Sequence, residues 1–187
     1  MADKYIILED AVRDMYARAV WSHKIQEKQA DIYQKQYKWM VIANIFITAL
    51  TSAGIISTIF CNHFWIKLLS TFLSFASIFF TLYLKLFDLN NQMKAHKDSA
   101  NNILTVRNEI FCLITSIKLK EKSIADLEDR YNELMDKANE TYKEAPSTTD
   151  KAVKLAKKAL QVKGDNTFSA EEIDSYLPPS LQKGGKK

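Results

Sequence analysis

Charge is distributed very unevenly along this 187-residue chain. Of its 26 basic and 22 acidic side chains, only Lys67 falls among the 46 residues from Trp39 to Leu84. Such segregation indicates two different solvents, lipid for the nearly uncharged block and water for the rest, because charged side chains are costly in hydrocarbon. We therefore predict an all-α membrane protein rather than a soluble globular domain.

The uncharged block divides into two apolar runs, residues 39–60 and 64–87. The first run has 22 residues without a charged side chain, and at about 1.5 Å per residue such a helix crosses the ~30 Å hydrocarbon core of a bilayer. The second run has lysines only near its ends, Lys67 and Lys85, whose long side chains can reach the headgroups. Only three residues connect the runs, so we predict an antiparallel transmembrane hairpin. A buried hairpin in a soluble protein fits less well, because buried soluble helices are usually shorter or amphipathic.

Basic residues predict the orientation of this hairpin. Lysines cluster before the first run and after the second, whereas the turn region offers only Lys67. Because loops rich in lysine and arginine stay in the cytoplasm, we expect both termini to be cytoplasmic. The protein would then be a multi-pass protein of the inner (cytoplasmic) membrane, with the first span as its own insertion signal, since no cleavable signal peptide is visible.

The polar segments on either side of the hairpin carry helical periodicity. Residues 1–38 contain no proline or glycine, and we expect one cytoplasmic helix that runs into the first span with little or no break. Residues 88–145 repeat apolar side chains at intervals of three and four. This pattern predicts a cytoplasmic helical region, with Ser123 as a helix cap, that extends the hairpin as a bundle.

All three prolines and three of the four glycines fall in residues 146–187. This segment predicts a short basic helix, capped by Asp150 and ending near Val162, followed by a flexible tail in which Ser169 and Glu172 form a capping box. Lysines on one side of the short helix fit an anionic membrane surface, although a solvated helix packed on the bundle is the simpler interpretation. These lysines are Lys151, Lys154 and Lys158.

The sequence shows no catalytic, cofactor-binding or metal-binding pattern. His23, His63 and His96 are scattered and lack the neighbouring ligands of a zinc site. There is no glycine-rich phosphate loop, and the net charge of +4 does not by itself indicate nucleic acid binding. Cys61 and Cys112 are expected on opposite sides of the membrane, so we expect no disulfide between them. We expect a non-enzymatic protein without a cofactor or a bound metal.

Hydroxyl and amide side chains recur at helical spacing inside both predicted spans. Steps of three and four residues align such side chains on one face of a helix. The positions are Asn44, Thr48 and Thr51 in the first run, and Lys67, Ser70, Ser74, Ser77 and Thr81 in the second.

Two interpretations of this polar stripe stay open. The side chains can hydrogen-bond between packed helices, or they can line a water-filled pore formed when several hairpins associate, because two helices alone cannot enclose a channel. In a pore, Lys67 would form a cationic ring at the outer mouth, a weak indication of anion preference.

Aromatic and basic residues around the spans follow a familiar order. They are the segment YARAVWSH at 16–23, then Tyr33, Tyr37 and Trp39, and after the spans His96, Ala100, Asn101 and Arg107. Over roughly residues 5–145 this layout resembles the SLATT family, prokaryotic two-transmembrane effector domains found beside nucleotide-second-messenger synthases, nucleotide-sensing domains or reverse transcriptases.

The resemblance implies a role in anti-phage defence. Proteins of this kind are thought to homo-oligomerise, permeabilise the inner membrane and arrest or kill the infected cell, which is called abortive infection. A cyclic nucleotide or an operon-encoded partner protein would trigger them. Arg18, His23 and Lys24 are basic and can meet an anionic trigger, although ordinary charges on a helix surface explain them more simply. The alternative function is a membrane-anchored helical scaffold that recruits a cytoplasmic partner without forming a pore.

Overall fold

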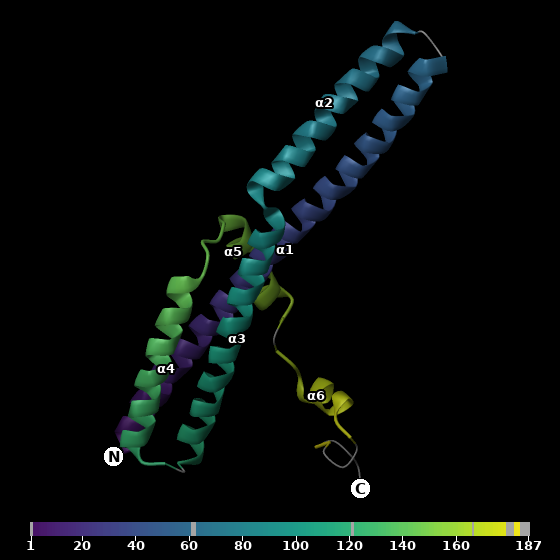
Figure 1. The fold of residues 1–187 in the computed structure, drawn as a ribbon. Coiled ribbons are helices and arrows are strands. Elements are labelled where there is room, and N and C mark those ends of the chain that lie inside the picture. Colours follow the sequence, from purple (N-terminus) through teal and green to yellow (C-terminus); the bar gives the residue numbers. More distant parts are fainter. Residues whose placement is uncertain (1, 61–62, 121, 166, 179–181, 184–187) are drawn as a thin grey trace.

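The computed structural model describes residues 2–60, 63–120, 122–165, 167–178 and 182–183. Within these residues every regular element is a helix, which confirms the predicted all-α fold. A hairpin of two helices forms one end of an elongated molecule, and a helical bundle forms the other (Figure 1). In chain order the elements are α1 (Ala2–Phe60), α2 (Phe64–Phe87), α3 (Leu89–Leu119), α4 (Ile124–Glu144), α5 (Asp150–Lys157), the π-helical turn η1 (Lys158–Val162) and α6 (Ala170–Tyr176).

Helix α1 is a single element of 59 residues that belongs to both ends of the molecule. It contains no proline, and its one glycine is Gly54, so its backbone hydrogen bonds can continue from the bundle into the hairpin. At about 1.5 Å per residue it extends for roughly 90 Å. The same helix therefore connects the bundle with the hairpin without a break.

The hairpin exposes the side chains that a soluble protein would bury. Phe46 on α1 is 67% exposed and Phe72 on α2 is 70% exposed. Only 11% and 6% of the residues in the apolar windows of the two long helical stretches are buried, whereas the core helix of a soluble protein would bury most of such a window. Apolar exposure on this scale, in helices long enough to cross a bilayer, indicates lipid as the surrounding solvent.

The bundle has the opposite arrangement, with its apolar side chains inside. Helices α1, α3 and α4 surround an apolar core. Burial of one Val, Leu or Ile side chain in this core stabilises the fold by about 1.5–3 kcal/mol. Its largest fully buried apolar side chains are Val12, Ile103, Val106, Ile110, Ile117, Leu127 and Leu134.

Asp88 forms the junction between the hairpin and the bundle. Its backbone is left-handed, with φ 41° and ψ 48°, a conformation that aspartate tolerates better than most residues. Its carboxylate accepts hydrogen bonds from the backbone N–H of Asn91 at 3.4 Å and from the side-chain amide of the same residue at 2.5 Å. Asp88 thus ends α2 and caps α3, which runs back along α1 (Figure 1).

Helix α5 packs against α1 through the buried Ala152 and Ala156. The prediction that Asp150 caps this helix is wrong, because Thr149 is the N-cap. The hydroxyl of Thr149 accepts a hydrogen bond from the N–H of Ala152 (3.4 Å) and donates one to Gln29 of α1 (2.7 Å). The same side chain therefore starts the helix and attaches it to the bundle.

Two other predicted caps are confirmed. Ser123 accepts a hydrogen bond from the N–H of Asp126 at the start of α4. Ser169 and Glu172 form a reciprocal capping box at the start of α6. Cys61, one of the two cysteines in the disulfide argument, lies outside the described residues.

Candidate functional site

The middle of the hairpin contains a polar seam between α1 and α2. The side-chain amide of Asn44 donates to the hydroxyl of Thr81 at 3.3 Å, and its carbonyl accepts from the hydroxyl of Ser77 at 3.4 Å. The hydroxyls of Thr48 and Ser77 lie 3.0 Å apart. In lipid, such bonds join helices that have no hydrophobic drive to associate. These four members of the predicted stripe therefore hold the hairpin together.

Close backbone approach continues this seam toward the turn. A Cβ atom added to Gly54 of α1 would lie 2.3 Å from Oγ of Ser70 and 3.2 Å from its Cβ. Ser70 is buried on α2, and its hydroxyl donates to the carbonyl of Ile66 at 2.8 Å. Thr51 is also buried and donates to the carbonyl of Ile47 at 2.7 Å. The two hydroxyls thus satisfy themselves within their own helices, and the absence of a side chain at position 54 allows the helices to meet.

The remaining members of the stripe, Lys67 and Ser74, lie in a groove on the hairpin surface. The groove has a volume of about 500 Å³, and Thr71, Phe75 and Ile55 also line it. A second hollow of about 380 Å³ lies at the bundle end of the hairpin and includes Asn44, Thr81, Lys85 and Asp88. Lys67 and Ser74 are therefore open to the outside of the pair, whereas Thr48 and Ser77 join the two helices. Asn44 and Thr81 do both.

A buried polar cluster joins three segments of the bundle next to the hairpin. Nδ1 of His96 on α3 donates to Oε1 of Gln26 on α1 at 2.5 Å, and Nε2 of Gln26 donates to the carbonyl of Pro146 at 3.0 Å. Gln29, also on α1, accepts from both the backbone N–H (2.9 Å) and the hydroxyl of Thr149. Tyr33 stacks on His96 with ring centroids 5.4 Å apart. The cluster fastens the α4–α5 connection to α1 and α3.

Burial sets the protonation of the cluster. Desolvation lowers the pKa of His96 below its ordinary value, so its imidazole is neutral at pH 7. From the sequence, His96 was considered as a metal ligand and as part of the family pattern. The roles of Gln26 and Gln29 were not predicted. The sequence signal for the cluster is that these two glutamines lie three residues apart, away from the charged face of their helix.

The three basic residues proposed to meet a trigger do not form one patch. Arg18 is exposed and pairs with Asp14 at 2.7 Å. The side chain of Lys24 is only 5% exposed and pairs with Glu27 at 2.8 Å and with Asp165 at 3.4 Å.

His23 has a third environment. Its Nδ1 is buried without a hydrogen-bond partner among the described atoms. Desolvation lowers the pKa of His23; Arg107 and Lys24 act in the same direction, and Glu27 opposes them. The ring borders a hollow of about 270 Å³ between α1 and α3, together with Lys97 and Asn101. Of the three candidates, His23 is the one that lines this hollow.

A comparison with protein families decides what this architecture is. A model described as SMODS and SLOG-associating 2TM effector domain family 4 matches residues 8–172. The chain belongs to the SLATT family. No curated protein and no solved structure matches it.

The SLATT match extends farther than the sequence resemblance, which ended near residue 145. It includes α5, the π-helical turn and the beginning of α6. Helix α5 and its lysines are therefore part of the SLATT domain rather than an appended tail. The family description and the two apolar helices together show a membrane effector domain.

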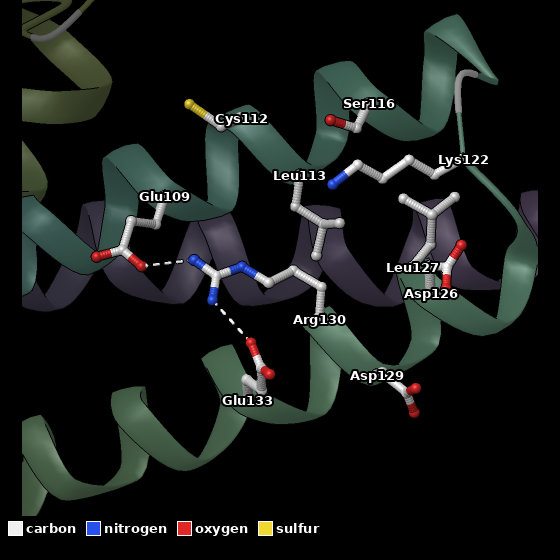
Figure 2. Close-up of a pocket in the computed structure, with 10 residues that line it drawn as sticks. All are labelled: Glu109, Cys112, Leu113, Ser116, Lys122, Asp126, Leu127, Asp129, Arg130 and Glu133. Carbon is white, nitrogen blue, oxygen red and sulfur yellow. Dashed lines mark hydrogen bonds and ion pairs between the residues drawn. The ribbon is translucent and has the colours of Figure 1, made fainter.

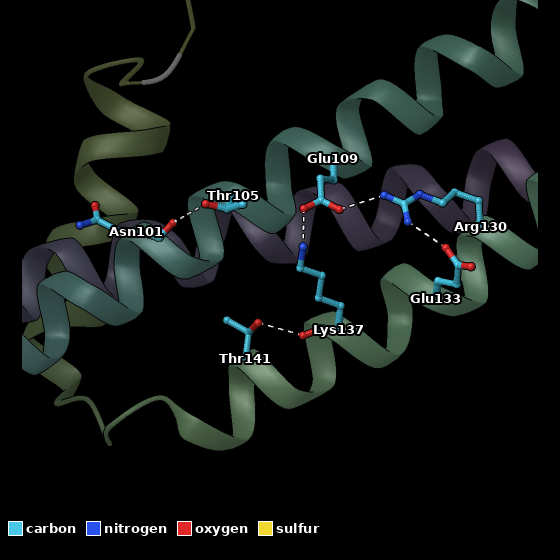
Figure 3. Close-up of polar contacts among 7 residues, drawn as sticks. All are labelled: Asn101, Thr105, Glu109, Arg130, Glu133, Lys137 and Thr141. Atoms are coloured by element: carbon cyan, nitrogen blue, oxygen red, sulfur yellow. Dashed lines mark hydrogen bonds and ion pairs between the residues drawn. The ribbon is translucent and has the colours of Figure 1, made fainter.

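At the far end of the SLATT bundle, ion pairs connect α3 with α4. Glu109 of α3 pairs with Arg130 at 2.9 Å and also with Lys137, and Arg130 extends to Glu133 at 2.8 Å (Figure 3). Figure 2 shows a groove of about 550 Å³ that Glu109, Arg130 and Glu133 line, together with Cys112. The side chains are roughly a quarter to two thirds exposed, so each pair contributes about 0.2–1 kcal/mol. We interpret this network as a clamp between helices.

Among the described residues no group of His, Cys, Asp and Glu could hold a metal ion.

Proposed function

We propose that this SLATT protein homo-oligomerises in the cytoplasmic membrane and permeabilises it as the effector of an anti-phage, abortive-infection system. The observation that carries the proposal is the groove on the hairpin surface, in which Lys67, Thr71 and Ser74 lie among apolar side chains such as Phe75. A hairpin that served only as an anchor would not need a lysine and two hydroxyls gathered in one groove. In a ring of hairpins, the groove can face a water-filled centre.

The hydrogen bonds of the seam indicate which residues are left to line the pore. Asn44, Thr48, Ser77 and Thr81 bond to one another across the pair, so a pore does not need them as its lining while the hairpin stays intact. The lining then falls to the groove residues, and Lys85 and Asp88 of the bundle-end hollow form a polar entrance. Lys67 would place a ring of positive charge in the pathway, which favours anions.

Opening would follow a population shift between two ways of arranging the bundle. Because α1 is continuous from bundle to hairpin, a trigger that moves the bundle also moves the first span. The buried cluster of His96, Gln26 and Gln29 holds the resting arrangement, since it fastens α1, α3 and the α4–α5 connection together. The trigger is a cyclic nucleotide or an operon-encoded partner protein that binds on the cytoplasmic side, where both termini lie, and the chain itself catalyses no reaction.

Membrane potential in growing cells tests this function. Expressed at a high level, alone and together with its genomic neighbours, the wild type should depolarise the cells, as reported by a potential-sensitive dye. Ser74→Leu should reduce the depolarisation severalfold because it fills the groove with an apolar side chain. The matched control is Ser57→Leu, because Ser57 is exposed on α1, lies outside this groove and bonds only to the carbonyl of Ala53 among the described contacts. Normal potential at full membrane expression of the wild type, in both settings, would contradict permeabilisation.

A further inference from the structure

A basic groove lies between α1 and α5, beside the end of the hairpin. Its volume is about 470 Å³. Five lysines and two aspartates line it, a net charge of +3, together with apolar and amide side chains. The lysines are Lys28, Lys35, Lys151, Lys158 and Lys163, and the aspartates are Asp31 and Asp165.

We propose that this groove binds the phosphate of an anionic phospholipid headgroup in the adjacent leaflet. The inference needs only that the hairpin lies in a bilayer, and it stands whether or not the protein forms a pore.

The charge balance in the groove favours an anionic ligand. Lys28 pairs with Asp31 at 3.1 Å, and Asp165 lies 3.4 Å from Lys24, which also pairs with Glu27. Both aspartates of the groove thus already have a cationic partner. Within the described residues, the four lysines Lys35, Lys151, Lys158 and Lys163 have no acidic partner. A phosphate that accepts hydrogen bonds from several ammonium groups can compensate this excess charge.

The fold positions these lysines before any ligand arrives. Buried Ala152, Ala156 and Ala159 seat α5 and the π-helical turn against the rest of the domain. Thr149 attaches the beginning of α5 to Gln29 of α1. The lysines of α5 and the π-helical turn therefore face the lysines of α1 across a groove of defined width, rather than extending from a mobile tail.

The location of the groove selects a lipid as the source of the phosphate. Lys35 precedes Trp39, the first residue of the apolar run, by four residues, which is about 6 Å along the helix. The headgroup zone extends about 5–7 Å beyond the hydrocarbon on each side of a bilayer. In Figure 1, α5 lies beside the first part of α3, just below the place where α2 ends. The side chain of Lys35, at the end of the groove nearest the hairpin, therefore reaches headgroup depth.

Lipid binding to the full-length protein tests the inference. Native mass spectrometry of the protein in a neutral detergent would compare phosphatidylglycerol with phosphatidylcholine of the same acyl chains. The wild type should prefer phosphatidylglycerol. The triple variant Lys35→Gln, Lys151→Gln, Lys158→Gln should bind it on the order of a hundredfold more weakly, because each lysine near an anionic surface contributes about fivefold.

Two further variants control for charge and folding. Replacing Lys94, Lys143 and Lys157 by Gln removes the same charge from exposed positions that do not line the groove, and this variant should bind like the wild type. Replacing the three groove lysines by Arg keeps the charge and should retain the preference for phosphatidylglycerol.

Three results would overturn the proposal. The first is equal binding of the two lipids by the wild type. The second is equal loss of binding in the groove and control variants, which would indicate a non-specific charge effect. The third is binding of soluble glycerol phosphate or ATP that displaces phosphatidylglycerol and needs the groove lysines, which would assign the groove to a soluble phosphate ligand.

Discussion

Nδ1 of His96 lies 2.5 Å from Oε1 of Gln26, and this contact joins α3 to α1 inside the bundle. Gln26 uses its other end to donate to the carbonyl of Pro146 at 3.0 Å. One side chain therefore connects three segments that are far apart in the sequence. We expect this connection to control the stability of the bundle and the position of α5.

Replacing Gln26 by Ala removes the partner of a buried imidazole and of a backbone carbonyl. Leaving buried polar groups unsatisfied costs about 1–3 kcal/mol, so thermal unfolding of the purified protein should occur at a clearly lower temperature. Gln92→Ala, at an exposed position of α3, should leave the midpoint within about 0.5 kcal/mol of the wild type. Equal midpoints for the two variants would show that the buried contact contributes nothing.

Acid should loosen the bundle through His96. Desolvation holds its pKa below the ordinary value of 6.5 in the folded protein, so the unfolded chain binds a proton more readily. The stability linked to this group is fully present above about pH 6.5 and is lost as the pH falls through the lowered folded-state pKa. His23 acts in the same direction, because burial also lowers its pKa.

The measurement is the unfolding midpoint between pH 7.5 and pH 5 for the wild type and for His96→Gln. The variant should show a shallower decline, because one of the two buried imidazoles is gone. His63→Gln, at the exposed turn of the hairpin, should retain the wild-type decline. A decline in His96→Gln as steep as in the wild type would assign the pH dependence to other groups.

Gly54→Val should separate the two spans. The new side chain would collide with Ser70, whose Cβ lies 3.2 Å from the position of an added Cβ. Overpacking of this kind typically costs about 1–3 kcal/mol, which a thermal-stability assay in detergent can detect. Ala53→Val adds two methyl groups to the neighbouring position, which is exposed, and should have little effect. The account of the seam fails if the two variants are equally stable.

Glu109→Ala should weaken the clamp between α3 and α4 only slightly. Its pairs with Arg130 and Lys137 are partly exposed, so we expect a loss of up to about 1 kcal/mol that shrinks at high salt. Chemical unfolding at low and high ionic strength measures both quantities. Glu128→Ala, an exposed carboxylate of α4 without an ion pair among the described residues, is the control. A loss that does not depend on salt would argue against the ion pairs as its cause.

The hairpin and the bundle could be predicted from the sequence because their signals are local. A nearly uncharged block of two helix lengths, and apolar residues repeated at threes and fours, indicate lipid and core faces without any knowledge of partners. Capping motifs such as Ser169 with Glu172 are local too, and the structure confirms that box. It was harder to predict whether Thr149 or Asp150 caps α5, because Thr149 is also held by Gln29, which lies 120 residues away in the chain.

The candidate site was less predictable because it depends on how elements rotate against one another. Spacing placed Ser74 and Ser77 in one stripe, but the rotation of α2 against α1 turns Ser77 into the seam and leaves Ser74 in the outer groove. The contact between His96 and Gln26 joins residues 70 positions apart and has no local signature. The basic groove likewise exists only because α5 folds back onto α1.

Membrane extraction of the full-length protein tests the central claim most directly, since the proposed pore and the lipid-binding groove both require residues 39–87 to cross a bilayer. Cells expressing the protein would be broken, and their membranes washed with alkaline carbonate, which strips peripheral proteins. We predict that the protein stays in the membrane pellet and is released only by detergent. Recovery of folded, monodisperse protein from the soluble fraction without detergent would contradict the account.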